Sequence, residues 1–151
     1  MTKIKLVVFD KTFLDLTWLW LNDPEIKYLV DSPTITKEQQ LEWFESLNKK
    51  EDYLIWGIKY SNVPVGVCGL KNITDESSEY WGYIGEKEFW GLGIGSIILD
   101  KMIYKAKTLK NKYIWLKVLN SNKRAIDLYS RKNFKILDKL SSGHLKMKLD
   151  L

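Results

Sequence analysis

Three glycines at alternate positions lie where an aromatic, strand-like segment changes into an apolar, helix-like one. They are Gly91, Gly93 and Gly95, and Trp90 precedes them. Glycine adopts backbone angles that other residues resist, and it lets a ligand approach the main chain closely. The N–H groups and the positive dipole end at the start of a helix attract phosphate. The spacing therefore predicts a site for a phosphorylated ligand at residues 90–95.

The size and charge of the chain limit the kinds of partner it can have. Its 151 residues suffice for one domain with its own core, which we expect over residues 1–151. The formal net charge of +5 favours anionic ligands. The basic residues are too few and too dispersed to indicate nucleic-acid binding. We therefore expect a small-molecule partner.

Cysteine usage and hydropathy predict the compartment. A single cysteine, Cys68, excludes an internal disulfide and fits a reducing environment. The start of the chain has no signal-peptide pattern, and no apolar stretch approaches the roughly 20 residues that span a bilayer. We expect a cytoplasmic protein without a membrane partner. Cys68 and His144 are the only residues of their types and lie far apart in the sequence, so no metal site is expected.

The elements that must position the glycine turn follow from hydrophobic periodicity. Strands are predicted at 4–9, 53–60, 65–73, 79–85, 112–119, 134–138 and 144–149, and helices at 12–21, 24–30, 37–48, 94–109 and 123–132. A polar turn is expected at 61–64. A meander of antiparallel strands joined to two β-α units predicts an α/β (α+β) fold with a mixed, mostly antiparallel central sheet and helices on both faces.

This order, with a glycine turn between the fourth strand and the third long helix, resembles the GNAT N-acetyltransferase superfamily. The family signature is Gln or Arg, two free positions, Gly, one free position, and Gly or Ala. Trp90, Gly93 and Gly95 occupy these positions here. A tryptophan at the first position is common in the branch that resembles ribosomal-protein and amino-sugar acetyltransferases.

A second motif supports the resemblance independently. The helix after the fifth strand of the family often carries Asn, Ala, an apolar residue, Tyr, Gly and Phe at fixed spacing. The matching residues are Asn122, Ala125, Leu128, Tyr129, Asn133 and Phe134. Asn133 replaces the usual glycine, and asparagine also accepts the left-handed backbone angles that end a helix. The resemblance covers essentially the whole chain.

The resemblance implies acetyl-CoA as the acyl donor. The glycine turn would hold its diphosphate, and main-chain groups of the fourth strand would pair with its pantetheine arm and stabilise the oxyanion. The implied cofactor-binding residues are Tyr83, Ile84, Gly85, Trp90, Gly91, Leu92, Gly93, Ile94, Gly95 and Asn122. Lys87, Lys123 and Arg124 are further candidates for the ribose phosphate, or else solvated surface charges.

The resemblance also implies a direct attack of a neutral amine on the thioester, which needs a base and an acid. Tyr129 is the expected acid. Glu79 is the first candidate for the base, although it lies one position away from the acidic residue of the branch. Glu86 is a weaker candidate, and a chain of water molecules without one dominant base is an equal alternative.

Aromatic residues near the predicted site suggest the acceptor. Trp20, Tyr28 and Trp81 are expected to bind it, because aromatic platforms suit a sugar ring or a nucleobase. The leading hypothesis is an amino-sugar, which can be nucleotide-linked. Alternatives are the N-terminus of a ribosomal or other protein, a cationic amine, and a non-catalytic acyl-CoA sensor. A cationic amine would require clustered carboxylates, which the sequence pattern does not indicate. A monomer or homodimer is expected.

Overall fold

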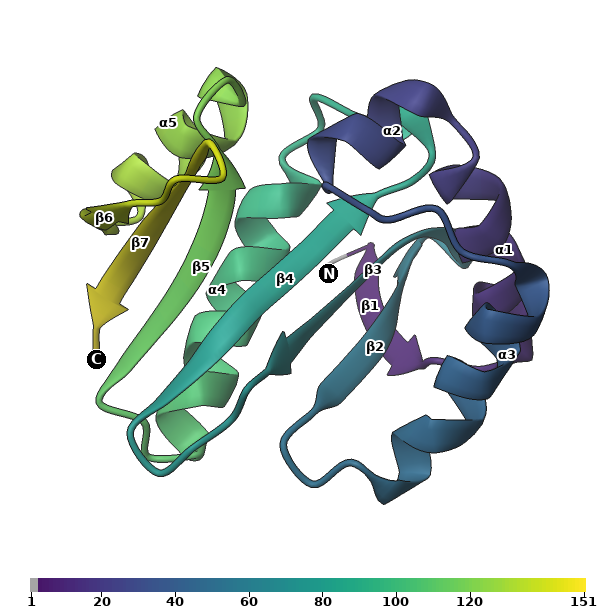
Figure 1. The fold of residues 1–151 in the computed structure, drawn as a ribbon, viewed down its shortest axis with the longest axis horizontal. Helices are drawn as coiled ribbons and strands as arrows, with labels where there is room; N and C mark the ends of the chain where they lie inside the picture. Colours follow the sequence, from purple (N-terminus) through teal and green to yellow (C-terminus); the bar gives the residue numbers. More distant parts are fainter. Residues whose placement is uncertain (1–2) are drawn as a thin grey trace. The chain divides into compact units, whose positions relative to one another are not determined.

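The computed structural model describes residues 3–151, and within this range it has seven strands and five α-helices (Figure 1). The strands are β1 (Ile4–Val8), β2 (Leu54–Tyr60), β3 (Val63–Lys71), β4 (Ser77–Ile84), β5 (Tyr113–Leu119), β6 (Lys135–Lys139) and β7 (His144–Asp150). The helices are α1 (Lys11–Leu21), α2 (Pro24–Leu29), α3 (Lys37–Ser46), α4 (Ile94–Thr108) and α5 (Lys123–Arg131). Single 3-10 turns occupy Leu47–Lys49 and Lys87–Phe89.

The strands form one mixed sheet in the order β1-β2-β3-β4-β5-β7-β6. The β4–β5 pair is parallel, whereas β1–β2, β5–β7 and β6–β7 are antiparallel. The predicted fold class is therefore confirmed.

The chain divides into two compact units, and β4 runs through both. The N-terminal unit comprises residues 1–69 and 82–95, and the C-terminal unit comprises residues 70–81 and 96–151. Each unit is built from two separate segments of the chain. The expectation of one domain over residues 1–151 stays a prediction.

Side-chain caps set the helix starts of the N-terminal unit. Asp10 accepts a hydrogen bond from the Phe13 N–H, and α1 begins at the next residue, Lys11. Thr36 and Gln39 form the predicted capping box of α3, with reciprocal bonds of 2.8 and 3.1 Å. The core of this unit includes the buried side chains of Phe9, Phe13, Leu14, Trp20, Ile26, Ile58, Val65, Val67, Cys68 and Ile94.

The hairpin between β2 and β3 is tighter than the sequence pattern indicated. Ser61 and Asn62 both have positive φ, 46° and 69°, so two residues complete the turn. This backbone matches the twist of the flanking strands. Val63 and Pro64 already belong to β3, and the predicted turn at 61–64 is corrected to residues 61–62.

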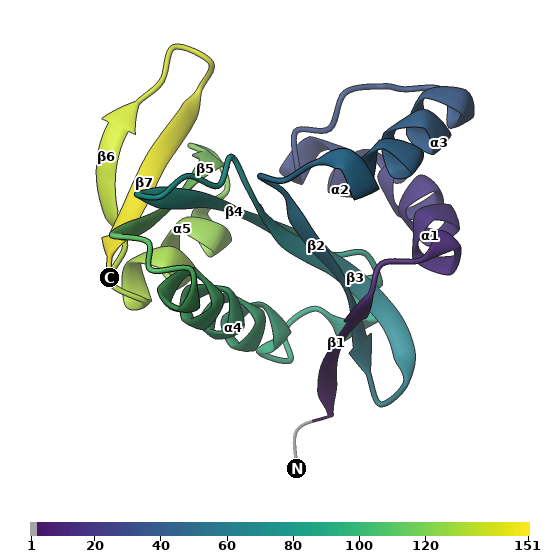
Figure 2. The ribbon, with the colours of Figure 1, turned by 90° about the horizontal axis from the view of Figure 1, so that it is seen from below.

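The C-terminal unit packs one face of its strands onto an apolar core. Figure 2 shows β6 and β7 as a hairpin at the C-terminal end. The buried side chains include Leu70, Tyr80, Ile98, Leu99, Met102, Ala106, Ile114, Leu116, Val118, Phe134, Leu145 and Met147. Asn122 accepts a hydrogen bond from the Ala125 N–H and caps α5. Asn133 has a φ of 72° just after this helix, which confirms the left-handed conformation expected there.

Candidate active site

The glycine turn adopts the backbone conformation for which glycine is required. Gly91 and Gly93 have φ values of 82° and 80°. A Cβ atom added to Gly93 would meet no heavy atom within 4 Å, so that side of the main chain is open. Residues 91–93 are exposed, and α4 starts directly after them at Ile94.

The start of α4 differs from the other helix starts in its capping. Side chains of Asp10, Asp23, Thr36 and Asn122 accept N–H bonds at the starts of the other four α-helices. Gly93 precedes α4 and has no side chain that could do this. The first N–H groups of a helix have no intrahelical partner. The turn therefore fits an external anion such as the diphosphate of coenzyme A.

Main-chain hydrogen bonds show which groups of β4 face away from β3. The N–H of Gly85 donates to the carbonyl of Val65 over 2.7 Å, so this group is already engaged within the sheet, and the expected role of Gly85 toward pantetheine stays a prediction. The Tyr83 carbonyl also faces β3, because it lies only 2.3 Å from where a Gly66 Cβ would be. Successive residues of a strand direct their main-chain groups to opposite edges. Ile84 is thus the member of the predicted trio that faces the other edge.

Trp90 fastens the glycine turn to this edge of β4. Its indole Nε1–H donates to the carbonyl of Ile84 over 2.9 Å. The indole therefore fixes the entry to the turn. The Ile84 N–H remains the candidate donor to an oxyanion.

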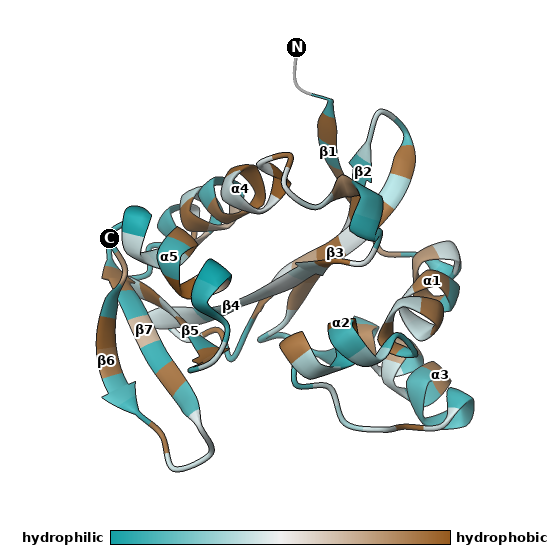
Figure 3. Ribbon diagram, turned by 90° about the horizontal axis from the view of Figure 1, so that it is seen from above, coloured by the Kyte–Doolittle hydropathy of each residue, from teal (hydrophilic) through white to brown (hydrophobic). Residues whose placement is uncertain are grey.

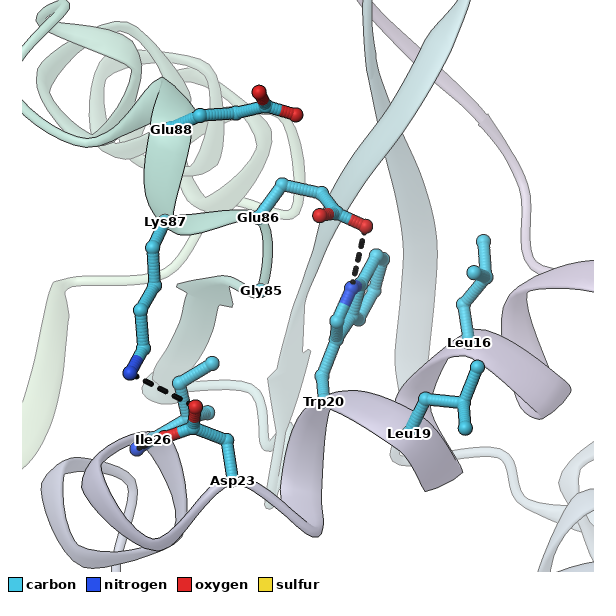
Figure 4. Close-up of a pocket in the computed structure, with 9 residues that line it drawn as sticks. All are labelled: Leu16, Leu19, Trp20, Asp23, Ile26, Gly85, Glu86, Lys87 and Glu88. Carbon is cyan, nitrogen blue, oxygen red and sulfur yellow. Dashed lines mark hydrogen bonds and ion pairs between the residues drawn. The ribbon is translucent and has the colours of Figure 1, made fainter.

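A cavity of about 450 Å³ lies in the N-terminal unit, at the end of β4 (Figure 4). Its wall combines an aromatic ring, apolar side chains and charged groups. The lining residues are Leu16, Leu19, Trp20, Asp23, Ile26, Gly85, Glu86, Lys87 and Glu88. This composition suits a small molecule that has both an apolar surface and a positive charge.

Trp20 and Glu86 form the central contact of the cavity wall. The Trp20 Nε1–H donates to Oε1 of Glu86 over 3.0 Å. The indole also lies against Gly85, where an added Cβ would come within 2.1 Å of its ring. Gly85 is therefore required by the close approach of Trp20. In the part of the chain that the structure describes, no side chain is bonded to Oε2 of Glu86.

Lys87 is held by two carboxylates of the α1–α2 region. Its Nζ lies 2.8 Å from Asp23 and 2.9 Å from Glu25. The hydrogen bond that Lys87 donates to Asp23 raises the pKa of Lys87 and lowers the pKa of Asp23. Lys87 therefore ties the loop after β4 to α2. Its suggested role on the ribose phosphate has no support in this arrangement.

The carboxylates gather more than the sequence pattern indicated. Asp23, Glu86 and Glu88 line one cavity, and Lys87 is its only lining cation among the described residues. The expectation that acidic residues do not cluster is therefore wrong. The run Glu86-Lys87-Glu88 follows β4 after Gly85. This run is the sequence feature from which an acidic lining could have been predicted. Asp23 joins it only through the tertiary fold.

The three aromatics predicted to bind the acceptor have different surroundings. Trp20 lines the cavity. Tyr28, on α2, is 60% exposed and is not among the lining residues. Trp81 belongs to the C-terminal unit and is half-buried.

Glu79 is a buried, fully engaged carboxylate of the C-terminal unit. Its side chain is 7% exposed, Oε1 accepts from Asn72 Nδ2 over 2.8 Å, and Oε2 lies 4.0 Å from Lys71 Nζ. A covered carboxylate with both oxygens occupied is poorly placed to accept a substrate proton. The environment therefore argues against Glu79 as the base.

Tyr129 lies on α5 among aromatic rings. Its ring centroid is 6.5 Å from that of Tyr80 and 5.9 Å from that of Phe134. Burial raises the pKa of Tyr129 to about 12. Because Glu79 neighbours Tyr80 on β4, its side chain points to the opposite face from the one that carries the Tyr80–Tyr129 contact. The raised pKa keeps the Tyr129 hydroxyl protonated at neutral pH, as a proton donor requires.

Residues 3–151 contain neither a candidate metal site nor a candidate membrane-spanning helix. No group of three or more His, Cys, Asp or Glu side chains there could hold a metal ion. No helix in this range is long and apolar enough to cross a membrane. Cys68 is fully buried, and burial raises its pKa to about 12, as suits the core residue that was predicted.

Known proteins share both the sequence pattern and the fold. Acetyltransferase PseH of Campylobacter jejuni is 25% identical over 126 residues, which cover 83% of this chain and 78% of PseH. The crystal structure of PseH with acetyl coenzyme A aligns with a TM-score of 0.76 at 22% identity, covering 97% of this chain and 98% of PseH.

Two other solved structures have the same fold at lower or similar identity. A domain from Methanocaldococcus jannaschii aligns over 100% of both chains, with a TM-score of 0.87 and 23% identity. Spermidine N-acetyltransferase from Vibrio cholerae, in complex with CoA and spermine, has a TM-score of 0.87 at 16% identity and covers 98% of this chain and 95% of that one.

The family comparison settles the assignment of the chain. The sequence profile described as the acetyltransferase (GNAT) family matches residues 14–134, which include the glycine turn, the cavity residues and Tyr129. This match favours an enzyme over the non-catalytic sensor. The chain therefore belongs to the acetyltransferase (GNAT) family and is a GNAT-type N-acetyltransferase with acetyl-CoA as its acetyl donor.

Proposed function

We propose that this enzyme acetylates a primary amine of a small hydroxylated molecule, and that the acceptor is an amino-sugar. The cavity at the end of β4 is the observation that carries the proposal. The apolar side chains of Leu16 and Leu19 offer a surface for the apolar face of a sugar ring, and the carboxylates attract its ammonium group. Its volume of about 450 Å³ is within the range of small-molecule sites.

The proposed chemistry is a direct transfer that uses residues of this chain for both proton steps. Acetyl-CoA supplies the thioester carbonyl. Glu86 accepts the proton of the acceptor ammonium, since its Oε2 is not engaged by another side chain of residues 3–151 and Trp20 holds its Oε1. The Ile84 N–H donates to the developing oxyanion, and Tyr129 protonates the leaving thiolate.

The cofactor residues are proposed from the geometry of the turn. Gly91, Leu92, Gly93, Ile94 and Gly95 present N–H groups to the diphosphate, and Trp90 holds the turn on β4. Asn122 caps α5 with its carbonyl oxygen, which leaves its amide N–H groups for the cofactor.

A second candidate acceptor is a polyamine or another polycationic amine. The charges of the cavity lining favour it, because three carboxylates outnumber the single cation, Lys87. It differs from a free amino-sugar in carrying more than one positive charge. The N-terminus of a basic protein is a weaker candidate, because a cavity of about 450 Å³ has the size of a small-molecule site.

A panel of amines tests the proposal. Purified protein and acetyl-CoA are mixed with glucosamine, UDP-glucosamine, spermidine or an octapeptide. The free thiol of the released CoA is measured with a colorimetric thiol reagent. Fastest release with glucosamine or UDP-glucosamine supports the amino-sugar, and fastest release with spermidine replaces it by the polycation. Release with the peptide alone would overturn both small-molecule acceptors.

A further inference from the structure

One face of β5 and β7 in the C-terminal unit carries aromatic and basic side chains in alternation with buried ones. Trp115 pairs in register with Lys148, and Lys117 pairs with Lys146. The intervening Leu145 and Met147 are buried. Figure 3 shows this alternation of polar and apolar residues along β7. Trp115, Lys117, Lys146 and Lys148 therefore share the face that is turned away from the core; we call these four residues the Trp115 cluster.

The two lysines at the centre of the Trp115 cluster are an unfavourable pair by themselves. Lys117 and Lys146 lie directly opposite each other on neighbouring antiparallel strands. Like charges in this position destabilise a sheet. Within residues 3–151 no carboxylate forms an ion pair with either ammonium, whereas Lys148 is paired with Asp150 at 3.2 Å. Asp138 of β6 lies in register with Lys146 on the other side of β7 without forming an ion pair, so both ammonium groups lack an ion-pair partner among these residues.

Both ammonium groups meet over the ring of Trp115. Nζ of Lys146 lies 4.2 Å from the ring centroid and Nζ of Lys117 lies 5.8 Å from it. A cation over an aromatic face is attracted by the ring, which counteracts the repulsion between the two ammonium groups. Because a lysine side chain is long and flexible, each ammonium can move from the ring to a stronger anionic partner.

The chemistry of this face matches one class of ligand. An aromatic base stacks on an indole with about 1–3 kcal/mol of stabilisation, and two adjacent lysines match two linked phosphates. A nucleic-acid strand would need a longer basic track than two lysines supply. We propose that the Trp115 cluster binds a nucleoside diphosphate, with the base stacked on Trp115 and the phosphates paired with Lys117 and Lys146.

The inference deepens the proposed function and rests on it only in part. A nucleoside diphosphate is the carrier group of a nucleotide-linked amino-sugar, so the Trp115 cluster would bind the same class of molecule as the proposed acceptor. Binding to the Trp115 cluster is nevertheless measurable without turnover. The two ideas can therefore fail separately.

The test is a calorimetric titration with UDP as the probe. Saturating CoA is present throughout, so that UDP cannot occupy the coenzyme site. Wild type is compared with Trp115→Leu, Trp115→Phe, Lys117→Gln and Lys146→Gln. Lys107→Gln, at an exposed position of α4, controls for the loss of one positive charge.

We expect Kd for UDP to rise at least tenfold in Trp115→Leu, Lys117→Gln and Lys146→Gln, and to stay within threefold in Trp115→Phe and Lys107→Gln. Uridine and pyrophosphate, tested separately, should each bind more weakly than UDP. Absence of UDP binding to wild type, or equal binding to all variants, overturns the site. If pyrophosphate and UDP bind equally well and Trp115→Leu has no effect, the proposal of a nucleotide site is refuted and the cluster binds a simple anion.

Acetyl transfer to glucosamine and UDP-glucosamine, measured alongside UDP binding, distinguishes failure of this inference from failure of the proposed function. Turnover of glucosamine without any UDP binding leaves the proposed function standing and refutes the nucleotide site. UDP binding that depends on Trp115, without turnover of either sugar, supports the site and refutes the amino-sugar acceptor. Circular dichroism of each variant excludes loss of folding as the cause, and the two lysine variants keep the test valid if Trp115→Leu does not fold.

Discussion

The indole of Trp20 and the carboxylate of Glu86 are joined by a hydrogen bond of 3.0 Å across 66 positions of the sequence. Helix α1 thereby sets the orientation of the acidic side chain that follows β4. The same indole packs on Gly85, so ring and N–H perform separate tasks.

Trp20→Phe separates these two tasks. The phenyl ring keeps most of the contact with Gly85 and removes only the N–H donor. We expect kcat to fall about tenfold, because Glu86 loses the bond that orients it, while the Kd for acetyl-CoA stays unchanged. Steady-state kinetics and calorimetry measure the two quantities. A change in acetyl-CoA affinity alone would contradict the positioning role.

Glu86→Gln tests the proposed base. A general base contributes about 10²–10⁴-fold, so kcat at neutral pH should fall by about 10²-fold. The deficit should shrink about tenfold per pH unit as the pH rises toward the pKa of the acceptor amine, because an amine that arrives neutral needs no base. Glu88→Gln is the matched control and should keep a nearly constant ratio to wild type. A Glu86→Gln deficit that is independent of pH would assign the carboxylate to binding.

Gly93→Ala tests the phosphate turn against a matched glycine. Gly93 and Gly143 have φ values of 80° and 83°, and an added Cβ meets nothing within 4 Å at either position. Alanine at a left-handed position costs about 1–2 kcal/mol, so both variants should lose similar stability. Only Gly93→Ala should weaken CoA binding, by at least tenfold in calorimetry. Equal CoA affinity of the two variants would remove the turn from the site.

Tyr129→Phe tests the proposed acid. The ring contacts with Tyr80 and Phe134 survive, and the hydroxyl is lost. We expect kcat to fall by about 10²-fold with unchanged Kd for acetyl-CoA. Tyr104→Phe, at a 70% exposed position of α4, should behave as wild type. An unchanged kcat at saturating substrates in Tyr129→Phe would refute the assignment.

Burial of Cys68 makes a prediction about alkaline stability. Its pKa rises from 9.0 to about 12 on folding, so the folded state holds the thiol proton more tightly than the unfolded state. The corresponding stability is present below pH 9 and is lost as the pH rises from 9 toward 12. The free energy of unfolding should fall by about 1.4 kcal/mol per pH unit from this group.

Urea unfolding at pH 8 to 11 measures this slope. Cys68→Ala should be less stable at pH 8 because of the cavity, and should show a shallower decline above pH 9. A parallel decline in both proteins would assign the loss to other groups. The native thiol should also resist chromogenic disulfide reagents at pH 8, so that released CoA is measured without a contribution from the enzyme.

Local features of the chain were predictable because they depend on neighbours in sequence. Thr36 and Gln39 cap α3, Asn122 caps α5, and Asn133 ends it, since each group reaches main-chain atoms only a few residues away. The glycine turn is another locally determined feature, because the positive φ of Gly93 depends on the residue type and on the adjacent backbone.

The use of each carboxylate was decided only by the tertiary structure. Glu79 lies within β4 and Glu86 just after it, and the sequence alone could not tell which of the two carboxylates is free to act as a base. Asn72 and Lys71 engage the first, and Trp20 turns the second toward a cavity.

The amino-acid sequence by itself determined the family, the element order and the glycine turn, because motif spacing and periodicity are encoded along the chain. Long-range packing decided the rest. It gathered Asp23 with Glu86 and Glu88, fixed Lys87 between two acids, and set Lys117 opposite Lys146. Such charge neighbourhoods arise from the register of strands and the docking of helices, which no local pattern of residues specifies.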